Sequence, residues 1–285
     1  MRGMVDSIAF IGGGQMAGAL IGGLLKAGYP AARLSAAEPD AARAKILRDT
    51  FGITVKTTAV EVVSGAQIVV LAVKPQVMAE AVRGLKLAHG TSVISIAAGV
   101  RLASLRAWLG HGPLLVRCMP NTPALLGAGI TGLYAETPSP VLRAHAESVL
   151  RAAGECLWVE REELLDAVTA LSGSGPAYFF WLTEALRDAG QALGLDAAAA
   201  AKLARQTFIG AARMAQHSTD DLARLRANVT SKGGTTEAAV QHLEKSGGRA
   251  LFADALKSAA DRSRQIGDEL TAISRLPTPD SRPPL

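Results

Sequence analysis

The sequence predicts an α/β fold in which an N-terminal Rossmann-type dinucleotide-binding domain is followed by an all-helical dimerisation domain. Three observations predict it: a glycine turn near residue 12 joins an apolar strand to an Ala/Leu-rich helix, apolar strands alternate with helical stretches through the first half, and strands disappear from about residue 161. Alternation of this kind is typical of a parallel sheet with helices on its faces. We expect residues 1–160 to form the first domain, 161–276 the second, and the Pro-rich residues 277–285 a solvated tail.

The glycine turn follows the strand expected at residues 7–11. Gly12 and Gly14 match the first two glycines of G-x-G-x-x-G/A, and Ala17 matches the small third position. Such a turn lets a pyrophosphate approach the N-terminus of the following helix, where free N–H groups and the helix dipole favour anions. A plain structural turn is the alternative, but the strand before it and the helix after it favour a nucleotide site.

The remaining strands follow from short apolar runs. They are expected at residues 33–37, 68–73, 92–97, 114–118 and 130–135. Residues 68–73 are apolar throughout and rich in β-branched side chains, which indicates a central strand buried on both faces. Lys74-Pro75 must leave the sheet at its carboxyl edge, because proline cannot donate to the ladder, and that edge is where α/β sheets bind ligands. Residues 95–99 end a neighbouring strand with small side chains, against which a flat ring could lie.

In the helical half, Leu203, Thr207, Ala211 and Met214 mark one face of a long helix, surrounded by alanines that permit close packing. Only 4% of all residues are aromatic, so we expect the helices to gain part of their core from a partner subunit. A tight Ala/Leu bundle in a monomer is the alternative.

Composition narrows the function classes. The chain has 49% hydrophobic and 19% charged residues and a net charge of +5 from scattered basic side chains, which indicates a globular protein and argues against nucleic-acid binding. No apolar stretch of membrane-spanning length and no secretion signal are expected. Cys118 and Cys156, the only cysteines, suit a reduced cytoplasm. The five histidines lie far apart, so no metal site is expected.

Two turns in the helical half are dense in glycine and hydroxyl groups, at residues 172–176 and 228–237. Each alone is typical of a well-capped helix start, and Glu237 is placed to reach back as in a capping box. Together they favour an anion pocket, in which residues 233–236 would bind a carboxylate through backbone N–H groups and the helix dipole.

With these motifs in this order, the chain resembles the pyrroline-5-carboxylate reductase family, which makes L-proline in the last step of its biosynthesis. The matching segments are residues 10–17, 72–75, 95–100, 117–123, 166–178 and 231–236. They span residues 10–236, so the resemblance covers almost the whole chain.

The resemblance implies a Rossmann domain, a helical domain that interleaves with its partner in a homodimer, and assembly of five dimers into decamers. It implies NADP or NAD as hydride donor, and a substrate with a carboxylate, the cyclic imine, at the domain interface. The cofactor residues expected from the resemblance and the local pattern are Gly12, Gly13, Gly14, Gln15, Met16, Glu38, Val73, Lys74, Pro75, Ala97 and Ala98. The implied substrate residues are Glu162, Asn228, Ser231, Gly233, Gly234, Thr235 and Thr236.

Hydride transfer from C4 of the dihydronicotinamide to C5 of the imine is the implied reaction, and it needs positioning more than acid–base groups. Thr236 is expected to be the catalytic residue, with its hydroxyl bonded to the ring nitrogen. The alternative is that Thr236 is only a helix-start hydroxyl.

The sequence departs from the family pattern at three positions. Lys232 stands where the family usually has proline, and Ala59 lacks an asparagine amide that some relatives offer to the ribose region. Glu38 stands where relatives often carry a serine facing the 2′-phosphate of NADP. A carboxylate there favours the ribose hydroxyls of NAD and repels a 2′-phosphate, so the local chemistry favours NADH whereas the family favours NADPH.

Two other classes of function compete with this interpretation. A 3-hydroxyacid dehydrogenase-like enzyme or another imine reductase would share the architecture, although the hydroxyacid enzymes use a lysine that residues 177–186 lack. A non-catalytic dinucleotide sensor would keep the fold, but it would have no need of a carboxylate pocket.

Overall fold

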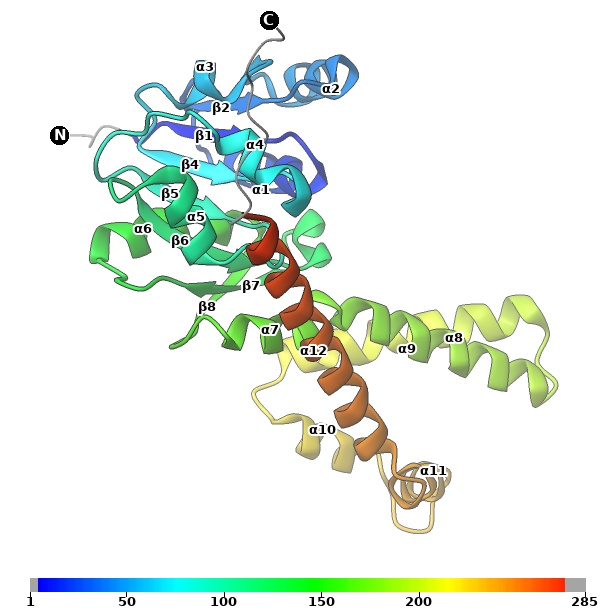
Figure 1. Ribbon diagram of the computed structural model, residues 1–285. Helices are drawn as coiled ribbons and strands as arrows, with labels where there is room; N and C mark the ends of the chain where they lie inside the picture. Colours follow the sequence, from blue (N-terminus) through cyan, green and yellow to red (C-terminus); the bar gives the residue numbers. More distant parts are fainter. Residues whose placement is uncertain (1–4, 275–285) are drawn as a thin grey trace, which may run out of the picture. The chain divides into compact units, whose positions relative to one another are not determined.

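The computed structural model describes residues 5–274 (Figure 1). The chain divides into two compact units. A Rossmann unit combines the described residues up to Gly173 with those from Ala259 onward, and a helical unit comprises Ser174–Ser258. The tail expected at residues 277–285 lies outside the described residues.

The Rossmann unit is built on an eight-stranded sheet. Its strands are β1 (Ile8–Ile11), β2 (Leu34–Ala37), β3 (Thr54–Lys56), β4 (Ile68–Leu71), β5 (Ser92–Ser95), β6 (Leu114–Met119), β7 (Gly129–Tyr134) and β8 (Gly154–Trp158). They lie in the order β3-β2-β1-β4-β5-β6-β7-β8. All neighbouring pairs are parallel except β6 and β7. The strand order reverses direction between β1 and β4, which is the position where doubly wound sheets bind dinucleotides.

Helices cover both faces of this sheet. They are α1 (Gln15–Lys26), α2 (Ala41–Phe51), α3 (Ala59–Val63), α4 (Met78–Val82), α5 (Leu102–Leu109), α6 (Pro140–Leu150) and α7 (Leu164–Val168). Short 3₁₀ turns are η1 (Ala31–Arg33), η2 (Pro75–Val77), η3 (Thr122–Leu126) and η4 (Arg151–Ala153), and η5 (Thr169–Gly173) is a π-helical turn.

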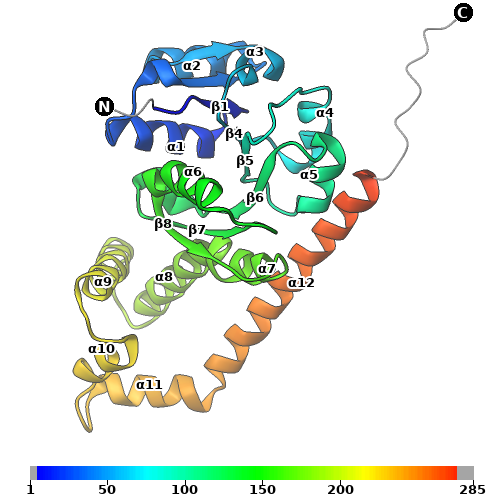
Figure 2. The ribbon, with the colours of Figure 1, turned by 90° about the vertical axis from the view of Figure 1, so that its left-hand side faces the viewer.

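Alternate residues of the strands point into two separate cores. Ile8 and Phe10 of β1 pack with α1, α2 and α6 on one face, whereas Ala9 and Ile11 pack with α3, α4 and α5 on the other. Figure 2 shows the strands between α1 and α6 on one side and α4 and α5 on the other. The strand at Ile68–Leu71 is buried at every position, as expected for a central strand covered on both faces.

The helical unit contains α8 (Gly175–Ala192), α9 (Ala197–His217), α10 (Leu222–Asn228), α11 (Thr235–Lys245) and the first part of α12 (Gly248–Ser274). Asp196 and Asp221 cap α9 and α10 by accepting hydrogen bonds from backbone N–H groups in the first turn. None of the helices in the described part of the chain is long and apolar enough to cross a membrane.

The structure confirms the α/β fold class expected from the sequence and adds two strands to it. Neither β3 nor β8 was expected, because β3 has only three residues and β8 alternates half-buried with exposed positions at the edge of the sheet. The boundary between the two units follows the packing of the chain and not the change in secondary structure near residue 161. For this reason α7 and the end of α12 belong to the Rossmann unit.

Candidate functional site

The glycine turn between β1 and α1 has a geometry that only glycine can adopt at residue 12. Gly12 has φ of +97°, and a Cβ there would lie 2.8 Å from the carbonyl oxygen of Ala72. Gly14 precedes α1 in an extended conformation, and no side chain among the described residues caps the helix there. The first N–H groups of α1 are therefore open to an anion.

The expected cofactor residues of three strands meet at one edge of the sheet. Ile11, Leu71 and Ser95, the last residues of β1, β4 and β5, are direct neighbours in the parallel register. The segments that follow them, residues 12–16, 73–75 and 97–98, therefore leave the sheet side by side. Val73 Cγ1 also lies 2.9 Å from the position that a Cβ on Gly12 would occupy, so the two segments touch.

Glu38, directly after β2, points toward the glycine turn. Its side chain is 5% exposed; Oε2 accepts a hydrogen bond from the N–H of Gly13 at 2.9 Å, and Oε1 accepts one from Asp40 at 3.0 Å. Pro39, the next residue, does not turn this side chain outward. The carboxylate thus lies beside the turn at the carboxyl end of β1 and β2, where the ribose of a dinucleotide is held in this fold.

These features fit a nicotinamide dinucleotide. The space at Gly12, which a Cβ would fill, and the uncapped N-terminus of α1 suit a pyrophosphate. The Glu38 carboxylate beside the turn suits the hydroxyl groups of a ribose.

The glycine-rich turn before α11 lies in the helical unit. Gly233 has φ of +73°, which favours glycine, and a Cβ on Gly234 would lie 2.5 Å from Ser231 Oγ and 3.1 Å from the Ser231 carbonyl oxygen, so the turn is tightly packed. The carboxylate of Glu237 reaches back, as expected, but accepts a hydrogen bond from the N–H of Gly233 at 2.6 Å, one residue before the N-cap Gly234 that a capping box would use. Thr235 and Thr236 form the first positions of α11, where helical N–H groups have no intrahelical partner. The remaining two expected residues on this side are Asn228, at the end of α10, and Ser231.

Glu162 is the one expected substrate residue in the Rossmann unit. Its Oε1 accepts hydrogen bonds from the N–H of Leu102 at 2.9 Å and from Arg117 Nη1 at 3.1 Å. The Arg117 side chain is 6% exposed, so this is a largely buried ion pair. Tyr134 lies opposite Arg117 in the sheet register. Its pKa is raised, first by burial and second by nearby carboxylates, which include Glu162. That phenol therefore stays neutral at physiological pH.

A polar link that sequence reasoning missed joins the loop after β6 to the hydroxyl-rich turn before α8. Asn121 donates a hydrogen bond to Ser172 Oγ at 3.1 Å and accepts one from the N–H of Ile130 at 3.0 Å. Ser172 lies in the π-helical turn η5, a feature found often at functional sites. The motif M-P-N-T-P was visible in the sequence, but nothing local indicated that its asparagine would bind a serine 51 positions away.

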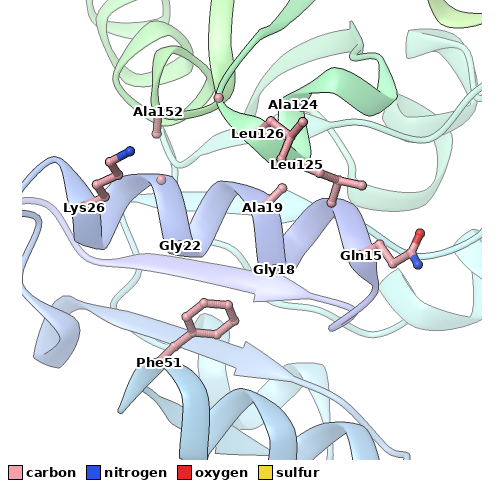
Figure 3. Close-up of a pocket in the computed structure, with 12 residues that line it drawn as sticks. Gln15, Gly18, Ala19, Gly22, Lys26, Phe51, Ala124, Leu125, Leu126 and Ala152 are labelled. Carbon is pink, nitrogen blue, oxygen red and sulfur yellow. The ribbon is translucent and has the colours of Figure 1, made fainter. Parts of the chain in front are cut away.

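A cavity of about 590 Å³ runs along the outside of α1 (Figure 3). Gly18, Ala19 and Gly22 line it on the helix, and Leu125 and Leu126 of η3 lie opposite. Of the expected cofactor residues, only Gln15 contributes to it. The cavity therefore begins at the dinucleotide turn but follows the helix away from the carboxyl edge of the sheet.

The fold and the dinucleotide cradle define this chain as an NAD(P)-dependent oxidoreductase, and residues 7–99 match the family described as NADP oxidoreductase, coenzyme F420-dependent. Residues 162–266 match the family described as pyrroline-5-carboxylate reductase dimerisation. The chain belongs to the pyrroline-5-carboxylate reductase family. This confirms the resemblance drawn from the sequence motifs, and the dimerisation match identifies the helical half as the region of subunit association.

Individual relatives cover nearly the full length of the chain. A pyrroline-5-carboxylate reductase from Pseudomonas aeruginosa is 47% identical over 92% of this chain and 97% of its own length. The structure of a pyrroline-5-carboxylate reductase from Coxiella burnetii has 38% identity and a TM-score of 0.84, covering 92% of this chain and 99% of that one. The Plasmodium falciparum enzyme, solved with NADP bound, has 27% identity and a TM-score of 0.77, covering 92% of this chain and 98% of that one.

Proposed function

We propose that this protein reduces (S)-1-pyrroline-5-carboxylate to L-proline by hydride transfer from NAD(P)H, the last step of proline biosynthesis. The observation that carries the proposal is the cradle around Gly12 and the uncapped start of α1, in a chain 47% identical to a pyrroline-5-carboxylate reductase. The P. falciparum relative with NADP bound supports the same cofactor class.

In the Rossmann unit, the N–H groups of Gly14, Gln15 and Met16 would hold the pyrophosphate. Ala97 and Ala98 would lie against the nicotinamide ring, with Val73, Lys74 and Pro75 from the neighbouring strand end beside it. When bound, NAD(P)H supplies the hydride. The protein then has to orient the two reacting rings and exclude water between them.

In the helical unit, the turn before α11 would hold the imine. The N–H groups of Thr235 and Thr236 would bind the substrate carboxylate, and the Thr236 hydroxyl would bond the ring nitrogen as the catalytic contact. Ser231, Gly234 and Asn228 would complete the turn, and Glu162 is the expected contact from the Rossmann unit. Glu237 already occupies the N–H of Gly233, so Gly233 would shape the turn and not donate to the carboxylate.

The enzyme would work as a homodimer, with five dimers forming a decamer. The match of residues 162–266 to a dimerisation family supports the first of these assignments. The absence of nucleic-acid and membrane partners stays a prediction.

The decisive experiment compares oxidation of NADH and NADPH by purified protein with and without pyrroline-5-carboxylate. We expect absorbance at 340 nm to fall only when the imine is present. Reduction of NAD+ or NADP+ that depends on an added 3-hydroxyacid would favour the rival enzyme class. Folded protein that binds NADH or NADPH but gives no imine-dependent rate would overturn the proposal in favour of a sensor.

We further propose that the reaction takes place in the cytoplasm. Cys118 and Cys156 are both free thiols. Burial raises the pKa of Cys118 and raises that of Cys156 to about 11, so both stay protonated and unreactive at neutral pH. Such thiols suit a reducing compartment.

A further inference from the structure

The loop after β5 packs closely against the C-terminal part of α12, with a glycine on each side of the contact. Gly99 of this loop has φ of +76°, and a Cβ there would lie 3.0 Å from Ile266 Cγ2. On the helix, a Cβ on Gly267 would lie 3.4 Å from the carbonyl oxygen of Gly99 and 3.3 Å from Arg101 Nε. Glycine on both sides therefore lets the helix backbone approach the loop backbone directly.

Charged groups fix this contact from two directions. Arg101 Nη2 lies 2.7 Å from Asp268 Oδ1 on α12. One residue further along the chain, the N–H of Leu102 donates to Glu162 at 2.9 Å, so an acidic side chain caps the start of α5. The loop at residues 97–101 is thus held between β5, α12 and Glu162.

A buried hydrogen bond sets the position of α12 along its own axis. Ser263 Oγ donates to Asp166 Oδ1 at 2.7 Å, and both residues are 7% exposed. One turn further on, Gly267 faces the loop. If α12 slid along its axis, the buried Asp166 carboxylate would lose this hydrogen-bond donor, which would destabilise the fold. The bond therefore fixes where Gly267 lies relative to the loop.

We propose that Gly267 and Asp268 are positioning residues for hydride transfer, which hold the loop at residues 97–101 in place against the nicotinamide ring. The inference rests on the proposed function, in which Ala97 and Ala98 lie against that ring. Ala97 is buried and Ala98 is exposed, so the loop offers one small side chain to the outside from an otherwise packed segment. Neither Gly267 nor Asp268 would touch the substrate or the cofactor.

Gly267→Ala tests this without a folding confound, because alanine favours a helix interior more than glycine does. The added methyl group would lie 3.3 Å from Arg101 Nε, so the Arg101 side chain, which pairs with Asp268, must shift by a few tenths of an ångström. A shift of 1 Å at a reacting centre costs on the order of 100-fold, so we expect kcat to fall roughly three- to tenfold. The KM for the imine should not change, and the melting temperature should stay the same or rise.

A second measurement needs no turnover. In cofactor-free protein, hydrogen–deuterium exchange of the amides at residues 97–102 should become faster in Gly267→Ala and in Asp268→Asn. Glu269→Gln is the matched control, since Glu269 is the next residue on α12, is exposed, and pairs with Arg262 instead of the loop. It should leave both exchange and kcat at wild-type values.

The outcomes separate this inference from the proposed function. Wild-type protein without imine reduction defeats the proposed function, and this inference with it. An active wild type whose Gly267→Ala and Asp268→Asn variants keep normal exchange overturns the positioning role alone. Faster exchange with unchanged kcat overturns it as well, because the loop would then move without consequence for the reaction.

Discussion

The Rossmann unit buries a core within one chain, whereas the helical unit buries almost nothing. Phe10, Ile68 and Leu105 are fully buried in the first. Among the described residues of the second, only Gly175, Ala200 and Ala204 are buried. The large apolar side chains that stay exposed on it are Phe179, Phe180, Trp181, Leu182, Leu186, Leu193, Leu195, Leu203, Met214, Leu222, Val229, Leu243, Leu251 and Phe252.

This difference shows which part of the molecule depends on a second subunit. Burying one Leu or Phe side chain stabilises a fold by about 1.5–3 kcal/mol. In a single chain, most of the large apolar side chains of the helical unit stay exposed and do not contribute this stabilisation. On α9, only the small side chains of Ala200 and Ala204 are buried, whereas Leu203 and Met214, which mark its apolar face, are 55% and 54% exposed. That exposed face is the one expected from the sequence to meet a partner.

The largest expected effect comes from placing charge on this face. In Leu203→Glu combined with Met214→Glu, two unpaired carboxylates would have to enter an apolar interface, at several kcal/mol. Light scattering should show at least twice the 29.5 kDa chain mass for the wild type and a single chain for the variant. We expect the imine-dependent rate to fall by more than about 100-fold, since each 1.4 kcal/mol lost is tenfold.

Ile46→Glu is the matched control. Ile46 is 60% exposed on α2 of the Rossmann unit, which has its own core. The same change of side chain there should alter neither mass nor activity. A wild-type monomer that is fully active at micromolar concentration would contradict the dependence on a partner.

A second contrast concerns chemistry, since the imine is assigned to the helical unit and the dinucleotide to the Rossmann unit. Thr236→Ala should lower kcat/KM for the imine roughly 5- to 150-fold, because a lost hydrogen bond of this kind costs about 1–3 kcal/mol. The Kd for NADPH, measured by fluorescence, should stay within twofold of wild type.

Thr230→Ala controls for the loss of any hydroxyl near this turn. The Thr230 hydroxyl donates to the carbonyl oxygen of Arg226 at 2.7 Å and so serves α10 alone. Its removal should leave kcat/KM unchanged. If Thr236→Ala behaves like Thr230→Ala, Thr236 is only a helix-start residue.

Local patterns in the sequence predicted most of the fold. Short apolar runs located six of the eight strands, and the glycine turn expected at Gly12 joins β1 to α1. The two missed strands lie at the edges of the sheet, where partial exposure weakens the apolar signal. That Glu237 would reach back to the turn was predictable because a helix cap spans only four residues, although its carboxylate accepts from Gly233 and not from the N-cap Gly234.

Contacts between distant segments were beyond the sequence. The bonds of Glu38 to Gly13 and of Arg117 to Glu162 join residues 25 and 45 positions apart. Nothing in either segment specifies the other, since the sheet register that brings them together depends on the packing of the entire unit. The motif at the end of β2 predicted that Glu38 faces a ribose, but the hydrogen bond that Glu38 accepts from Gly13 could not be predicted.

The smallest expected effect, on cofactor choice, tests that residue. If the Glu38 carboxylate faces the adenosine ribose, it favours NADH and repels the 2′-phosphate of NADPH. Like charges at a few ångströms cost about 1 kcal/mol in a water-like medium and several times more when partly buried. Glu38→Ser should therefore shift the ratio of kcat/KM values toward NADPH by roughly tenfold, while the KM for the imine stays constant.

The structure requires a control for this experiment, because Glu38 also accepts the N–H groups of Gly13 and Asp40. Serine would leave these two N–H groups without their acceptor, which would weaken the binding of NADH and NADPH alike. Glu38→Gln keeps one oxygen for hydrogen bonding and removes the charge. It should therefore shift the ratio of kcat/KM values toward NADPH, as serine does, while lowering kcat/KM for NADH less than serine does. Wild-type protein that uses both cofactors equally, together with substitutions that leave the ratio unchanged, would show that the carboxylate supports the glycine turn and takes no part in choosing the dinucleotide.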